Sequence, residues 1–196
     1  MLNCSFKIAN RIYHTAIGIF VLGAMLALPA CAVNTGDEGT QDEETATTEQ
    51  ALTGWTFYTS DELEPISCGG TLVNGVQCRG AYCDDIRYYC LQTPGVRTDS
   101  YWTPQFSEEG SSTGKNRGFC NEGYWVSGIA CEHDNCDNVS LECSQMANVS
   151  AHDCNWTGWH SEESGGQLWF GTGYYARGAE CRGSKCDDMR YYVCQL

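Results

Sequence analysis

The stretch "CRGAYCDDIRYYC" at residues 78–90 decides the fold, because it returns as "CRGSKCDDMRYYVC" at residues 181–194. A third copy, "CEHDNCDNVSLEC", occupies residues 131–143 and keeps the cysteine spacing while most other residues change. Self-similarity of this kind indicates a repeated structural unit. Residues that all copies share are therefore explained first as scaffold.

Further shared features lie upstream of each copy. A Trp-Thr pair is followed after three residues by serine and two acidic residues, in "WTFYTSDE", "WTPQFSEE" and "WTGWHSEE". A glycine also precedes each copy by three residues, at Gly75, Gly128 and Gly178. These features predict one domain at residues 54–196, built from three repeats at about 54–100, 101–150 and 151–196.

Alternation of residue types predicts short strands. Ile86, Tyr88 and Cys90 alternate with Arg87 and Tyr89, which is the period of a half-buried strand. The third copy carries one extra residue, Val193, which we interpret as a β-bulge. No window shows a helical stripe, so an all-β fold is expected. The second strand of each repeat is predicted at residues 71–77, 124–130 and 174–180, and the Trp-Thr segments supply a third.

The N-terminal part indicates export. Residues 1–30 contain Lys7 and Arg11, no acidic residue and a short apolar run, as a signal peptide does. The run ends in "LPAC", which resembles a lipobox, so Cys31 is the expected lipidation site of a bacterial lipoprotein. The acidic segment from Cys31 to residue 53 is expected to be a disordered tether. We therefore expect a lipid-anchored protein in the outer membrane or at the surface of a Gram-negative bacterium.

Cysteine usage agrees with export. Of fourteen cysteines, Cys4 lies in the signal peptide and Cys31 at the lipobox, which leaves twelve in the repeats. An even, dense set in an exported chain predicts disulfides, and the four-residue gaps are poor zinc spacing. Connectivity does not follow from sequence alone. The spacing suggests Cys78–Cys83, Cys131–Cys136 and Cys181–Cys186 as bridges across turns, and Cys68–Cys90, Cys120–Cys143 and Cys154–Cys194 as longer ones.

Charge excludes one class of partner. The sequence has 25 acidic and 11 basic residues, and such a chain repels nucleic acids and anionic lipid head groups. We expect no nucleic-acid partner. Contact with the membrane is expected through the lipid anchor, and a glycan or another envelope component is the expected ligand.

The repeat resembles the vitelline membrane outer layer protein family. The resemblance rests on a strand that ends in Cys, as "DIRYYC" and "NVSLEC" do, and on the order Trp, Cys, Gly, Asp-containing turn. It implies a three-repeat β-prism with pseudo-threefold symmetry and one sheet per repeat. The short cysteine loops depart from the family pattern. A β-trefoil-like barrel is the alternative fold.

Related prisms bind sugars, so the resemblance also implies carbohydrate recognition. We interpret Trp55, Trp102 and Trp156 as core residues because all three repeats share them. Aromatic residues found in one copy are better candidates for a sugar-binding surface, with carboxylates nearby as hydroxyl acceptors. The candidates are Trp125, Trp159, Trp169, Tyr174 and Tyr175, with Glu162 and Glu163.

Other functions stay open at this point. The acidic triplets and the turn aspartates could hold calcium, although neighbouring strand residues point to opposite faces. The sequence shows no nucleophile motif or histidine cluster, and His133, His152 and His160 are expected at the surface. We therefore expect no catalytic residues, no enzyme activity and no required cofactor. A structural envelope protein without a small ligand is the main alternative to a lectin, and a glycan-active enzyme is a further one.

Overall fold

The structure is a computed structural model that describes residues 53–109 and 115–196. The predicted signal peptide, Cys31 and the tether lie outside the described residues. Within them, regular structure consists of twelve strands and four short 3-10 turns, without an α-helix. None of the helical segments described is long and apolar enough to cross a membrane. The all-β prediction is confirmed.

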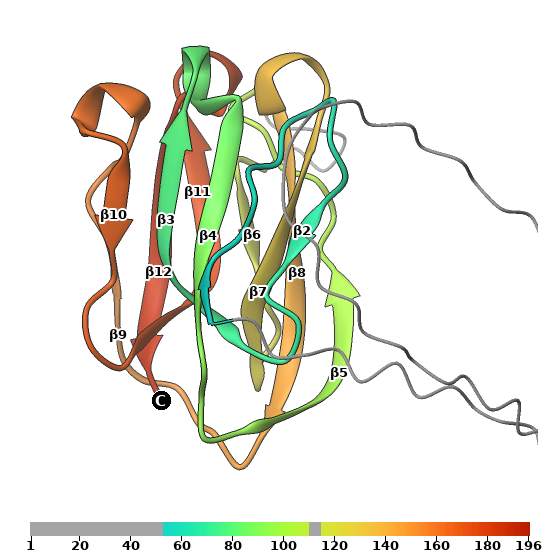
Figure 1. The fold of residues 1–196 in the computed structure, drawn as a ribbon, viewed down its shortest axis with the longest axis vertical. Coiled ribbons are helices and arrows are strands. Elements are labelled where there is room, and N and C mark those ends of the chain that lie inside the picture. Colours follow the sequence, from blue (N-terminus) through green and yellow to red (C-terminus); the bar gives the residue numbers. More distant parts are fainter. Residues whose placement is uncertain (1–52, 110–114) are drawn as a thin grey trace, which may run out of the picture. The chain divides into compact units, whose positions relative to one another are not determined.

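The strands form three antiparallel sheets of four strands each (Figure 1). In spatial order, sheet A contains β1 (Gly54–Trp55), β4 (Asp85–Leu91), β3 (Leu72–Arg79) and β10 (Gln167–Trp169). Sheet B contains β2 (Ile66–Ser67), β7 (Tyr124–Glu132), β8 (Asn138–Ala147) and β5 (Val96–Trp102). Sheet C contains β6 (Arg117–Phe119), β11 (Tyr174–Arg182), β12 (Asp188–Gln195) and β9 (His152–Trp156).

Each sheet combines three strands of one repeat with one edge strand of another. Strand β2 of the first repeat pairs with β7 in sheet B, and β6 of the second repeat pairs with β11 in sheet C. Strand β10 of the third repeat pairs with β3 in sheet A, which closes the cycle. The expectation of one sheet per repeat is therefore wrong, because every repeat gives one strand to a neighbouring sheet.

The core lies between the sheets. Strands β3, β7 and β11, one from each sheet, contact one another in pairs. Strand β4 buries every second side chain, as its alternation predicted, and β12 does so over most of its length. Tyr88 of β4 and Tyr191 of β12 meet edge to face in the core with 6.1 Å between ring centroids.

The glycine before each cysteine makes room for the edge strand of another repeat. A Cβ atom at Gly178 would lie 2.6 Å from Phe119 Cδ1 and 2.7 Å from the carbonyl oxygen of Gly118, both in β6. At Gly75 a Cβ atom would lie 3.1 Å from the Leu168 carbonyl oxygen and from the Trp169 ring. An edge aromatic ring thus lies over a strand glycine, an arrangement known to stabilise glycine in sheets.

Six disulfides link the twelve cysteines, with the connectivity that the spacing suggested. The third repeat differs in one respect. Val193 pairs with Ala176 as Cys90 pairs with Val73, so Val193 occupies the cysteine position and is not the inserted residue. The register irregularity lies against β9, between Val193 and Gln195, next to the displaced Cys194.

Candidate functional site

Two of the five predicted sugar-binding aromatics belong to the interior, and a third is half-buried. Trp125 is 1% exposed and Tyr175 is 5% exposed, and both lie in a small core cluster with Leu72. Tyr174 is half-buried and packs against the main core. The prediction of a surface role is wrong for Trp125 and Tyr175, because their rings are buried in this core cluster.

The two remaining aromatics lie on different sheets. Trp169 belongs to β10 of sheet A and is 49% exposed. Trp159 follows β9, and its ring lies 4.1 Å and 4.6 Å from the guanidinium carbons of Arg182 and Arg190 in sheet C. The third repeat therefore does not form one site, since its strands serve two sheets.

The repeated tryptophans are not core residues. Trp102 is 43% exposed, and Trp55 and Trp156 are half-buried on the outer faces of their sheets. Trp55 pairs with Tyr89 and Trp156 pairs with Tyr192, in phase with the outward side chains. The sequence signal for an outward position was this match with the alternation of the neighbouring strand. Repetition alone does not distinguish the inner from the outer face of a sheet.

Sheet A carries an aromatic cluster on its outer face, which we call face A. The rings of Trp55, Tyr89 and Trp169 meet edge to face, with centroid distances of 5.4 Å, 5.3 Å and 4.7 Å. The Arg87 guanidinium lies 4.8 Å from the Trp55 ring and donates two hydrogen bonds to Gln77 Oε1. Face A thus offers ring surface beside fixed polar groups.

Sheet C repeats this arrangement in what we call face C. The rings of Phe119, Trp156 and Tyr192 lie 5.3–5.7 Å apart between centroids. The Arg190 guanidinium lies 4.6 Å from the Trp156 ring and donates to Glu180 Oε2 at 2.9 Å and 2.6 Å. Two of the three sheets therefore present the same combination of three rings, an arginine and a polar acceptor.

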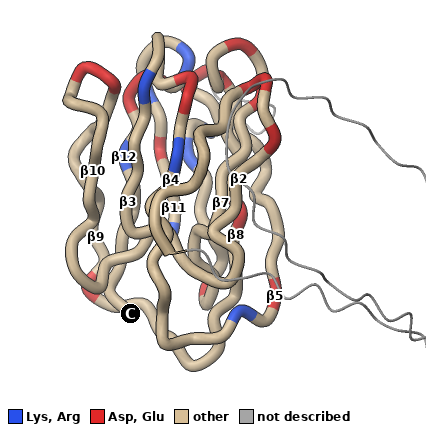
Figure 2. The backbone as a smooth tube through the Cα atoms, in the orientation of Figure 1, with Lys and Arg blue, Asp and Glu red and all other residues tan. Residues whose placement is uncertain are grey.

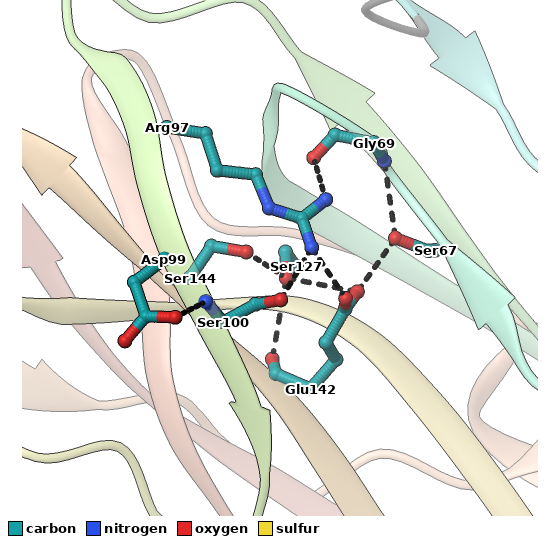
Figure 3. A network of polar contacts seen from close by, with 8 residues as sticks. All are labelled: Ser67, Gly69, Arg97, Asp99, Ser100, Ser127, Glu142 and Ser144. Atoms are coloured by element: carbon teal, nitrogen blue, oxygen red, sulfur yellow. Dashed lines mark hydrogen bonds and ion pairs between the residues drawn. The ribbon is translucent and has the colours of Figure 1, made fainter. Parts of the chain in front are cut away.

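Sheet B replaces the aromatic cluster by a polar network (Figure 3). Glu142 stands where faces A and C have tyrosine, and Ser67 stands in place of the edge aromatic. Glu142 Oε1 accepts from Arg97 at 2.9 Å, and Oε2 accepts from Ser67 at 2.5 Å and from Ser127 at 3.0 Å. Both carboxylate oxygens are occupied, so Glu142 has a structural role and is poorly placed as an acid or base.

A groove of about 600 Å³ lies next to this network and is lined by Gly70 and residues 95–100. Arg97 at its wall also donates to the Gly69 carbonyl oxygen and to Ser100 Oγ. Its guanidinium is thereby held by the protein itself. The groove has no aromatic lining, which distinguishes it from faces A and C.

Most of the described acidic residues gather at one end of the domain (Figure 2). The turns η1 (Ala81–Cys83), η2 (Asp134–Cys136) and η4 (Ser184–Cys186) contact one another there (Figures 1 and 2). The Glu108 carboxylate accepts from the backbone N–H groups of Lys185 and Cys186 at 2.5 Å and 3.3 Å. The predicted site residue Glu162, which begins the short turn η3 (Glu162–Ser164), accepts from the backbone N–H of Tyr82 at 3.3 Å.

Two of the three repeated triplets have a structural role at this acidic end. Glu108 and Glu162 each cap the cysteine turn of another repeat, while Glu163 is exposed. Burial, followed by a hydrogen bond and repulsion from Glu162, raises the pKa of Asp187 to about 6. Glu108 also lies near Cys181 and Cys186, but these two sulfur atoms form a disulfide and are not metal ligands.

The histidines are separated. His133 and His152 are exposed, as expected, but His160 is buried and its Nδ1 lies 3.1 Å from Ser164 Oγ. The expectation of a surface position is wrong for His160. Burial lowers its pKa and therefore favours the neutral imidazole.

Comparison of the chain with protein-family models, with curated proteins and with solved structures found no match in any of the three. The chemistry of the molecule's own surface must therefore indicate its function. Faces A and C are the strongest candidates, because two sheets present the same exposed arrangement.

Proposed function

We propose that this chain is a carbohydrate-binding protein, and that faces A and C are its binding surfaces. The observation that carries the proposal is the repeated cluster of three outward aromatic rings beside an arginine. Exposed aromatic clusters cost solubility and add little to a core, so their presence on two sheets supports a role in binding.

The chemistry of the two faces suits sugars. A pyranose ring has an apolar face that stacks on an indole or phenyl ring, and its hydroxyl groups require polar partners at the rim. Trp169 and Phe119 are 49% and 42% exposed and offer the stacking surface. Gln77 and Gln167 border face A, and Glu180 borders face C.

We further propose a three-repeat β-prism of the vitelline membrane outer layer type as the fold. Three separate four-stranded sheets and the pairwise contacts of β3, β7 and β11 favour the prism over a trefoil-like barrel. Lipidation at Cys31 and an acidic tether would hold this domain at the outer membrane or cell surface. The dense disulfides are compatible with export.

Two alternatives make different predictions. A structural envelope protein would use the aromatic faces in protein contacts and would bind no sugar. A glycan-active enzyme needs a carboxylate that can exchange protons, and both oxygens of the buried Glu142 are occupied. Calcium is not required by the proposal, although the acidic end makes it worth testing.

The test is a glycan array probed with the oxidised chain from Ala32 onward, with calcium and with EDTA. We expect the chain to bind glycans on the array. Trp169→Ala and Phe119→Ala should each weaken this binding about tenfold, since stacking on one aromatic ring contributes on the order of 1–3 kcal/mol. Trp102→Ala is the matched control, because Trp102 is equally exposed but lies on sheet B without the cluster.

The controls separate the alternatives. Loss of binding in all three variants would point to general instability, which melting curves of the variants would detect. If protein with six intact disulfides binds no glycan on the array, this result contradicts the proposal and favours a structural role. Binding abolished by EDTA would bring the acidic end into the site.

A further inference from the structure

One cross-strand pair is charged in face C and neutral in face A. Arg117 of β6 pairs with Glu180, whereas Gln167 of β10 pairs with Gln77 at the equivalent place in sheet A. The neighbouring cation Lys115 precedes β6 and is exposed, as is Arg117. Of these two equivalent edge strands, β6 carries a cation and β10 carries none.

These two cations have no side-chain partner among the residues that the structure describes. Among residues 53–109 and 115–196, the side chains of Lys115 and Arg117 make no hydrogen bond, ion pair or ring contact. Other arginines are occupied: Arg190 binds Glu180 and Arg177 donates to the Asn121 carbonyl oxygen. In a chain with 25 acidic residues, an unpaired basic pair beside an aromatic cluster requires an explanation.

A hollow adjoins this pair. It measures about 330 Å³, at the lower end of the range for small-ligand sites, and Phe119 forms part of its wall. Another hollow, between β1 of sheet A and β2 of sheet B, measures about 350 Å³ and has no basic residue in its lining. The residues around the hollow at face C are Thr103, Pro104, Lys115, Arg117, Gly118 and Phe119.

We propose that this hollow binds a sugar that carries a carboxylate, and this inference rests on the proposed function. The Arg117 guanidinium presents a planar fork that matches a carboxylate, and Lys115 adds a second positive charge. The Phe119 ring stacks against the sugar while the carboxylate meets the cations. Face A, with glutamine amides at the same place, takes neutral sugars.

The nearby acidic groups do not cancel this charge. Glu180 faces Arg117 across the strands, but its carboxylate binds Arg190 and Asn116. The Glu108 carboxylate is held by the backbone of η4. Positive charge from Lys115 and Arg117 is therefore available to a ligand.

The experiment compares a galacturonic acid oligomer with its methyl ester by calorimetric titration of the oxidised chain in EDTA. The ester keeps the sugar and removes only the charge, and EDTA prevents calcium from bridging the oligomer to the acidic end. A second arm compares sialyllactose with lactose, which distinguishes the two common sources of a sugar carboxylate. We expect the acid of at least one arm to bind about tenfold more tightly than its neutral control.

Arg117→Gln makes face C resemble face A and should abolish the preference for the acid over its neutral control. Lys115→Gln should reduce the preference, and Lys185→Gln removes one charge elsewhere as the matched control. Equal binding of acid and neutral forms, or equal effects of Arg117→Gln and Lys185→Gln, would overturn the inference. If glycan binding on the array still depends on Trp169 and Phe119 in that case, the proposed function is retained. If the array shows no binding, both the proposed function and this inference are contradicted.

Discussion

At the scale of single residues, the acidic end contains charges that the fold does not compensate. Asp187 lies at the end of η4, and its Oδ1 atom is buried without a hydrogen-bond partner. Burial and the neighbouring Glu162 raise its pKa from 3.8 to about 6. The pKa values of Asp84 and Asp137, the equivalent residues, are also raised, first by burial. In all three turns, the folded state therefore disfavours the charged form of this aspartate.

The raised pKa of Asp187 predicts how the stability of the fold depends on pH. Because the folded state holds the Asp187 proton more tightly than the unfolded state, the group stabilises the fold below about pH 4 and loses this contribution as the pH rises to about 6. Asp187→Asn should therefore raise the melting temperature by a few degrees at pH 7 and leave it unchanged near pH 4. Thermal unfolding followed by circular dichroism at both pH values tests this.

Asp188→Asn is the control for this prediction, since Asp188 forms an ion pair with Arg182 at 3.0 Å. That variant should gain no stability at pH 7. Equal stabilisation by both substitutions would show that net charge, and not the site of Asp187, determines the effect.

At the scale of elements, sheet B carries a buried ion pair at the position where sheets A and C carry packed aromatic rings. Arg97 and Glu142 are mostly buried, and removal of one partner leaves a buried charge. Arg97→Ala should lower the free energy of unfolding by about 2–4 kcal/mol. The exposed pair of Arg79 and Asp85 is the comparison, and Arg79→Ala should cost less than about 1 kcal/mol.

Urea denaturation of both variants and of the double variant Arg97→Ala/Glu142→Ala measures the difference. The double variant should recover part of the loss, because it removes the uncompensated carboxylate. If Arg97→Ala costs no more than Arg79→Ala, the network contributes little and sheet B needs another explanation.

The elements also show what the sequence could and could not predict. Alternation predicted the long strands, and cysteine spacing suggested all six bridges, because both are local patterns. The edge strands β2, β6 and β10 have only two or three residues and pair with another repeat, so no local pattern marks them. The same exchange moved Trp169 away from Trp159 and brought it to Trp55. The aromatic faces therefore became visible only with the sheet register.

At the scale of the whole domain, cyclic exchange of edge strands ties the three repeats together. No repeat completes a sheet alone, because β10, β2 and β6 each belong to a sheet of another repeat. Many repeat proteins unfold in parts because each repeat contacts only its neighbours. Here every repeat contacts both others, so we expect the domain to unfold as one cooperative unit.

A local perturbation tests this cooperativity. Gly178→Ala places a Cβ atom 2.6 Å from Phe119 and 2.7 Å from the β6 backbone, which should cost about 1–3 kcal/mol. We expect one calorimetric transition at a lower temperature, with equal calorimetric and van't Hoff enthalpies as for a two-state unit. Gly158→Ala is the control, because a Cβ atom there meets no atom within 4 Å. A second transition confined to Gly178→Ala would show that sheet C melts separately, and the exchanged strands would then be weak links between independent repeats.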